Sequence, residues 1–285
     1  MGGAWGLCAV KTEILDILAP SMERLTMLVV DGSEHLMRLR EMYPNVEMHA
    51  ITPYPEIAEN GDIAALGVHA HLLDWRRDPL PFADETFDRI ISEFAIESAY
   101  EPYDALMALN RALKETGTLY TCYTNIRYHR VLAGLRDGEF HVRGDRHLYA
   151  KPEIVRLLND TLYKEIHFFA GERDDDPAMG EAWAEDGFQN FSDDLTTRTW
   201  LIEASRSTAA AANLKRFFSH ETRRTIARLL HRVEYDIAAE KAVMSLRELC
   251  THEGIFHDYL ADFITEVCVH EEHVRAMLSD LLEQI

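Results

Sequence analysis

The feature that most constrains the fold of this chain is the alternation of short apolar runs with helix-like stretches between about residues 12 and 205. Seven runs have the length and composition of buried strands: 27–30, 46–51, 69–73, 87–92, 118–124, 163–170 and 197–205. Helical patterns lie between the first five, most clearly at 103–113, where leucines recur every three or four residues. Strands that alternate with helices form parallel sheets, so we expect an α/β domain with a mostly parallel seven-stranded sheet and helices on both faces. No crossover helix separates the last two runs, which predicts an antiparallel pair at one edge.

Two stretches depart from this alternation. Residues 171–195 are strongly acidic, and we interpret them as a solvated insertion in the α/β domain, with a lid or a cation-binding loop as the alternative. Residues 208–285 carry helical patterns only, with two apolar stripes on either side of Gly254. We therefore expect an α/β domain over 1–207 and a helical hairpin over 208–285. The hairpin must bury its stripes on the α/β domain or on a second copy of the chain, which would make a homodimer.

The charge balance limits the class of partner. The 285 residues include 29 Lys and Arg against 49 Asp and Glu, a net charge of −20. Nucleic acids and anionic lipid surfaces are held by basic faces, so neither is expected as a partner. The four cysteines form no CxxC pair, and no apolar run approaches the ~18 residues of a membrane span. These features predict a cytoplasmic protein.

Ligands of open parallel sheets bind where the strands reach their carboxyl ends. The residues at these predicted ends are Asp31, Gly32 and Ser33, then Thr52, then Asp74 and Trp75, and finally Glu93. Asp74 can accept a hydrogen bond from an adenine amine, and Trp75 offers a flat apolar face beside it. Asp74 can equally cap a turn or a helix start, and its position favours neither role.

Several motifs resemble those of class I S-adenosylmethionine-dependent methyltransferases. In HLLDWRRDPLPFADETFDRIISEFAIE, the strand-end Asp74, the Leu-Pro-Phe step at 80–82 and the Asp-x-x-Phe-Asp run at 84–88 follow in the order of that family. Lys114 and Gly117 match the turn before its fifth strand. Further matches are to a subgroup often encoded with glycosyltransferases: Asn125-Ile126-Arg127, Gly138-Glu139-Phe140, His147-Leu148 and Glu153. The resemblance implies a Rossmann-like fold, S-adenosylmethionine as cofactor, and O-methylation of a sugar or another small molecule.

The cofactor loops depart from the family pattern. The family has Gly-x-Gly after the first strand, where this chain keeps Gly32 and then has Ser33-Glu34-His35. The acid that holds the ribose hydroxyls is replaced by Thr52, which cannot make the two charge-assisted bonds of a carboxylate, each worth about 1.5–3 kcal/mol. The alternative function is therefore a catalytically inactive protein with degenerate motifs that has lost the cofactor and acts as a structural or regulatory partner.

Methyl transfer from a sulfonium requires an acceptor held in line with the methyl group and a base for its proton. Glu93, His129 and His147 follow the fourth and fifth predicted strands, where such a base is expected. His147 matches the histidine of the subgroup's Thr-His-Leu motif, with Arg146 in place of the Thr. The alternative is that Glu93 caps a helix and that both histidines pack or face solvent. His69 and His71 share one strand face without an evident third ligand, so no metal site is predicted.

Overall fold

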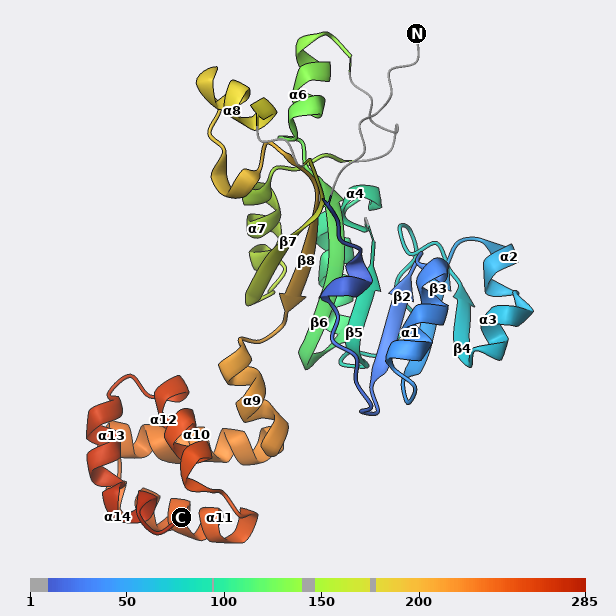
Figure 1. Cartoon of the computed structure of the whole chain (residues 1–285). Helices are drawn as coiled ribbons and strands as arrows, with labels where there is room; N and C mark the ends of the chain where they lie inside the picture. The colour runs from blue at the N-terminus through green and yellow to red at the C-terminus, as the bar shows by residue number, and fades with distance from the viewer. Residues whose placement is uncertain (1–9, 94, 140–146, 175–177) are drawn as a thin grey trace. The chain divides into compact units, whose positions relative to one another are not determined.

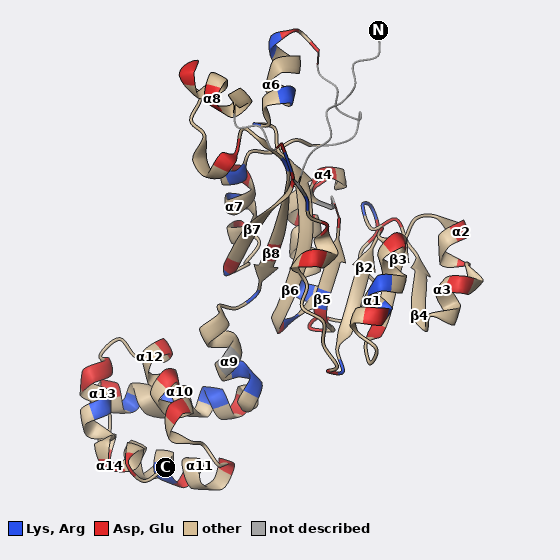
Figure 2. Cartoon of the chain, viewed as in Figure 1, with Lys and Arg blue, Asp and Glu red and all other residues tan. Residues whose placement is uncertain are grey.

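The computed structural model describes residues 10–93, 95–139, 147–174 and 178–285 (Figure 1). The chain divides into two compact units, Met1–Arg206 and Ser207–Ile285. Among the described residues, no helix has both the length and the apolar character needed to cross a membrane. Figure 2 shows that Asp and Glu residues occur on helices of both units.

The first unit is built on an eight-stranded sheet in the order β1-β7-β8-β6-β5-β2-β3-β4. Its strands are β1 Val10–Lys11, β2 Thr26–Val30, β3 Glu47–Thr52, β4 Val68–Leu72, β5 Phe87–Ser92, β6 Leu113–Thr124, β7 Glu165–Arg173 and β8 Thr197–Ser205. The five strands from β2 to β6 are parallel to their neighbours, whereas β8 runs antiparallel to both β6 and β7. The predicted mostly parallel sheet with an antiparallel pair is confirmed. The extra strand β1 has two residues and pairs with β7, too short a segment for a pattern to reveal.

Helices cover both faces of this sheet, as predicted. They are α1 Leu36–Met42, α2 Pro55–Ala58, α3 Gly61–Ala65, α4 Ala95–Ser98, α5 Pro102–Ala112, α6 His129–Arg136, α7 Lys151–Asp160 and α8 Ala178–Glu185, with 3-10 turns η1 Ile14–Ile17, η2 Ser33–His35 and η3 Phe191–Asp193. Successive side chains of a strand point to opposite faces. Leu28 and Val30 of β2 therefore join the core beneath α5 and α7, while Met27 and Val29 join the core beneath η1 and α1.

The acidic stretch 171–195 contains more regular structure than a solvated loop. Strand β7 continues through Arg173, and α8 forms within the stretch. Trp183 of α8 is buried and packs edge-on against Phe188, with ring centroids 5.0 Å apart. The guanidinium of Arg136 lies 5.5 Å from the Trp183 ring. The contacts of the buried Trp183 with Phe188 and Arg136 thus give this segment a packed structure despite its acidic composition.

The second unit is helical, but the predicted two-helix hairpin is wrong in its number of helices. The helices are α9 Ala209–Phe217, α10 His220–Glu234, α11 Ala239–Glu253, α12 His257–Val267, α13 Glu271–Met277 and α14 Ser279–Leu282. Left-handed backbone at Asp236, Ala238 and Gly254 divides the pattern into shorter helices. Both apolar stripes enter one core, in which Leu230 and Leu260 are fully buried. Most stripe residues therefore cover one another, while others, among them Ile237 and Met244, stay exposed. A homodimer through these helices stays a prediction.

Leu246 and Met244 of α11 provide a matched test of this core. The Leu246 side chain is fully buried, whereas Met244 is 64% exposed. We expect Leu246→Ala to lower the free energy of unfolding of the helical unit by about 2–5 kcal/mol, because the substitution leaves a cavity. Met244→Ala should change it by less than about 0.5 kcal/mol. Hydrogen exchange of the α10 and α11 amides measures both effects, and equal losses in the two variants would contradict the assigned core.

Candidate functional site

The carboxyl ends of the parallel strands lie together at one end of the sheet, which we call the cofactor edge. Val30 of β2 pairs with Ile51 of β3 and with Ser92 of β5, so the residues that follow these strands begin at the same level. This register brings together the loops that carry all of the residues predicted to bind the cofactor. The N–H of Asp31 continues the ladder by donating to the Ile51 carbonyl oxygen at 3.1 Å.

A hydrogen bond joins two of the predicted residues across this edge. The indole Nε1–H of Trp75 donates to Asp31 Oδ2 at 2.5 Å. Trp75 is 8% exposed, and the backbone of Asp31 is left-handed, with φ 52°. Burial raises the pKa of Asp31 above its ordinary value, although the Trp75 N–H and the nearby Arg76 act in the opposite direction. Asp31 Oδ1 is also buried and has no hydrogen-bond partner among the described residues.

An ion pair that sequence reasoning missed links β2 to β5. His35, at the end of the 3-10 turn η2, places Nε2 3.3 Å from Glu93 Oε1, with the two side chains 12% and 26% exposed. This is an ion-pair distance, but the alignment is not that of a hydrogen bond. Burial lowers the pKa of His35, but Glu93 and Glu34 outweigh burial and leave it raised. The signal in the sequence was His35 after one predicted strand and Glu93 after another, and β2 and β5 had to be recognised as neighbours before the two could be paired.

The His35 side chain also explains why a glycine is needed at position 32. A Cβ atom on Gly32 would lie 3.1 Å from His35 Cδ2 and 3.1 Å from Val29 Cγ1, closer than most side-chain contacts. The His35 ring therefore packs where the family's glycine-rich loop is bare. Ser33 begins the 3-10 turn and is half-buried. The ligand atoms of Glu34, His35 and Glu93 lie within 4.8 Å of one another, a spacing that suits a cation.

Thr52 and Asp74 already have partners within their own loops. Thr52 is buried, and its Oγ1 accepts a weak hydrogen bond from the Tyr54 N–H at 3.4 Å. Asp74 Oδ1 accepts from Arg76 Nε at 3.2 Å, and Asp74 Oδ2 lies 3.7 Å from Arg77 Nε. A ligand amine would have to share the Asp74 carboxylate with these two arginines.

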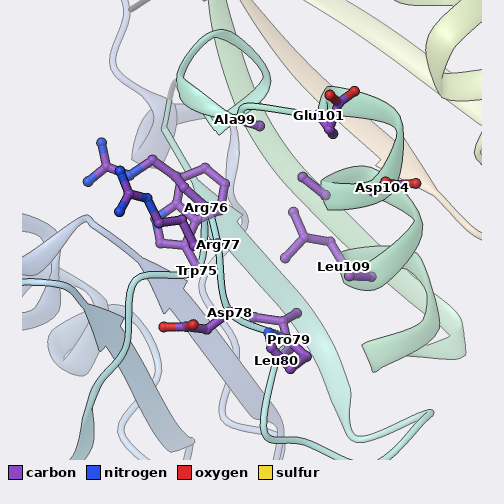
Figure 3. A pocket seen from close by; sticks show the side chains of 12 residues that line it. Trp75, Arg76, Arg77, Asp78, Pro79, Leu80, Ala99, Glu101, Asp104 and Leu109 are labelled. Carbon is purple, nitrogen blue, oxygen red and sulfur yellow. The ribbon is translucent and has the colours of Figure 1, made fainter.

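A pocket of about 400 Å³ adjoins Trp75 and lies within the size range of ligand sites (Figure 3). One wall is the segment 75–80, which carries Arg76 and Arg77, and the facing wall includes α5 with Asp104 and, just before it, Glu101. The segment 75–80 also carries Asp78, so charged residues of both signs border the pocket, and the guanidinium groups of Arg76 and Arg77 point away from the α5 wall (Figure 3). Sequence reasoning identified Trp75 but missed Glu101 and Asp104, because nothing in the sequence places them beside the loop that follows β4.

The predicted bases lie in different environments. His129 is buried at the start of α6, and its Nε2 lies 2.6 Å from Asp174 Oδ2, which also accepts the Tyr128 hydroxyl at 2.8 Å. His147 is exposed, and its backbone N–H donates to the Glu97 carbonyl oxygen at 3.0 Å, which fixes it next to α4.

No contact found among the described residues joins His129, His147 and Glu93. Phe140 and Arg146 of the subgroup motifs lie outside the described residues. Of the three predicted bases, Glu93 thus lies at the cofactor edge, His129 is buried in an ion pair, and His147 is exposed.

The His129–Asp174 pair predicts a pH dependence of stability. Burial raises the pKa of Asp174, but hydrogen bonds from His129 and Tyr128 outweigh it and leave the pKa below its ordinary value of about 3.9. A lowered carboxyl pKa stabilises the native state above pH ~4, and this stabilisation is lost as the pH falls through the folded-state pKa. We expect Asp174→Asn to lower the free energy of unfolding by about 1–3 kcal/mol at pH 7, and by less below pH ~4.

Urea denaturation across this pH range measures the effect. Asp84→Asn is the control, because Asp84 pairs with Arg111 at 3.2 Å while 62% exposed, and such pairs contribute less than about 1 kcal/mol. A loss in Asp174→Asn that is the same at every pH would contradict the assignment.

Residues 35–121 match the family model of a methyltransferase domain. This match confirms the resemblance to class I S-adenosylmethionine-dependent methyltransferases, and with it the cofactor of that family. The glycosyltransferase-associated subgroup stays a prediction. No curated protein matches the chain.

Solved structures of methyltransferases are also similar to the chain. One is from the complex between the Haloferax volcanii Trm112 methyltransferase activator and a methyltransferase, at 20% identity and TM-score 0.48, covering 67% of this chain and 86% of that one. An Aquifex aeolicus S-adenosylmethionine-dependent methyltransferase has 16% identity and TM-score 0.43, covering 66% and 85%. One from Mesorhizobium loti has 13% identity and TM-score 0.45, covering 66% and 93%.

Proposed function

We propose that this chain, which carries a methyltransferase domain at residues 35–121, transfers the methyl group of S-adenosylmethionine to a hydroxyl oxygen of a sugar or another small molecule. The observation that supports this most is the charge arrangement at the carboxyl ends of β2 and β5. Asp31, His35 and Glu93 place two carboxylates and a histidine with a raised pKa at one edge of the sheet.

These residues fit the methionine end of the cofactor. Asp31 Oδ1 and His35 Nε2 are buried atoms without hydrogen-bond partners among the described residues, and buried polar atoms are normally paired. The methionine end carries an ammonium and a carboxylate. Glu93 and Asp31 would hold the ammonium, and protonated His35 would hold the carboxylate. A charged pair here thus replaces the bare glycine backbone of the family.

The adenosine half fits the neighbouring loop less tightly. The Trp75 ring borders the pocket and would carry the adenine, while Asp74 would accept a hydrogen bond from the adenine amine in competition with Arg76. Thr52 offers a hydroxyl for the ribose where a carboxylate would form stronger, charge-assisted bonds. We therefore expect weaker binding than an acid at this position would give, about tenfold for each 1.4 kcal/mol.

When bound, the cofactor supplies an electrophilic methyl group on its sulfonium. The chain must orient the acceptor hydroxyl and accept its proton. Of the three predicted bases, His129 is paired with Asp174, and Glu93 is assigned to the ammonium of the cofactor. His147 is exposed beside α4, which follows β5, and is our choice for the base that accepts the proton.

Trp75 gives a direct test of cofactor binding. We expect Trp75→Ala to raise the Kd of S-adenosylhomocysteine at least tenfold, because the adenine loses its stacking face and Asp31 loses its donor. Trp183→Ala is the matched control, since Trp183 is also 8% exposed but lies in α8, and it should leave the Kd within about twofold. Thr52→Asp should lower the Kd. Isothermal calorimetry provides these values, and an unmodified chain that gives no heat at millimolar ligand would contradict the proposal and favour the inactive alternative.

His147 tests the chemical step. We expect His147→Ala to lower kcat by about 10²–10⁴, the usual contribution of a general base, with the cofactor Kd unchanged. The assay follows labelled methyl from S-adenosylmethionine onto monosaccharides and nucleotide sugars. His252→Ala, whose side chain is 82% exposed in the helical unit, should keep full activity. Full activity in His147→Ala would assign the base to another residue.

A further inference from the structure

Three histidines gather on one face of β3 and β4. His49 of β3 is directly opposite His69 of β4, and His71 lies two residues further along the same face of β4. In sequence, His69 and His71 lacked a third ligand. The strand pairing supplies it, because β3 and β4 are neighbours and β4 is the edge strand (Figure 1).

Two imidazole nitrogens already face each other at a ligand-like separation. His49 Nδ1 lies 3.2 Å from His71 Nε2. Two nitrogens bound tetrahedrally to one Zn²⁺ at 2.0–2.1 Å are about 3.3 Å apart. The His69 ring centroid is 5.1 Å from that of His49. The three histidines do not have their ligand atoms within 4.8 Å of one another, so the exposed His69 would join the same ion by rotating its side chain. A shared proton between His49 and His71 is the alternative explanation of the short contact.

The surroundings of His49 favour metal binding. Glu47 Oε1 lies 3.3 Å from His49 Nε2, on the opposite side of the ring from His71. Histidines that bind metals usually donate their second ring N–H to a carboxylate, which fixes the tautomer and leaves the first nitrogen free to coordinate. Phe82 packs edge-on against both His49 and His71, with ring centroids 5.6 and 5.2 Å away, and limits rotation of these two rings.

The surroundings of His71 favour its neutral form. Burial, with added repulsion from His49 and His69, lowers the pKa of His71 below its ordinary value. Neutral imidazole is the form that coordinates metal ions. Imidazole ligands suit Zn²⁺, Cu²⁺ and Ni²⁺, whereas Mg²⁺ and Ca²⁺ prefer oxygen.

We propose that His49, His71 and His69 bind one divalent transition-metal ion, with Zn²⁺ as the physiological choice and Glu47 as the carboxylate that orients His49. The ion would join the edge strand β4 to β3 and hold Phe82 of the following loop. This site does not depend on the proposed methyl transfer, because none of its residues is among those assigned to the cofactor or to the acceptor.

The test is Zn²⁺ binding to the full chain without a histidine tag, measured by competition with a chromophoric chelator. We expect one tightly bound equivalent of Zn²⁺ per chain. Its affinity should fall at least tenfold in His49→Gln and in His71→Gln, and 10–100-fold in Glu47→Gln. His167→Gln is the matched control. His167 pairs with Glu165 at 3.1 Å on β7, near the other edge of the sheet, and its loss should leave the tight equivalent intact.

Imidazole NMR of the unmodified chain removes any dependence on how the variants fold. Stoichiometric Zn²⁺ should shift the ring signals of His49, His69 and His71 before those of the other histidines. The proposal is overturned if the unmodified chain binds no Zn²⁺ at micromolar concentration, if the tight equivalent survives His71→Gln, or if other histidine signals move first.

Discussion

The hydrogen bond from the Trp75 indole to Asp31 is the contact on which the candidate site depends. It fastens the loop after β4 to the end of β2, and so positions Asp74 and one wall of the pocket. The bond forms because a carboxylate buried at a strand end needs a donor, and a buried tryptophan needs an acceptor for its N–H. On the other side of β2, the His35–Glu93 pair fastens the loop that follows β2 to the end of β5. Two side-chain links therefore join the segments that follow β4, β2 and β5.

These links give a physical account of the departures from the family motif. A glycine-rich loop binds its cofactor through bare backbone, whereas this loop fills the space over Gly32 with the His35 ring. When the ring is protonated, its charge is matched by Glu93, and a zwitterionic ligand end can exchange partners with such a pair. At Thr52, by contrast, only a hydroxyl stands in place of the missing carboxylate, and it already accepts a weak hydrogen bond from the Tyr54 N–H. The departures thus change the groups that contact the methionine end of the cofactor and weaken the binding of its ribose.

Local patterns in the sequence predicted the strands, their parallel arrangement, and Asp31 and Trp75 as residues of the site. These features depend on hydrophobic periodicity and on strand ends, which are local properties. Other features depend on contacts between distant segments. His35 was interpreted as an obstruction because its partner Glu93 is far away in sequence, and His49 was overlooked because β3 and β4 had to be paired first. The break between α10 and α11 depends on left-handed backbone at Asp236 and Ala238, and alanine is a residue type that does not signal a break.

The most direct measurement of the central claim is the indole ¹H–¹⁵N NMR spectrum during titration with S-adenosylhomocysteine. The chain has four tryptophans, so the Trp75 signal can be assigned by substitution. If the cofactor binds at the edge held by Asp31 and Trp75, the Trp75 signal will shift to saturation, while those of Trp183 and Trp200 stay in place. A Trp75 signal that does not move at millimolar ligand, or a shift confined to Trp183 or Trp200, would contradict the account.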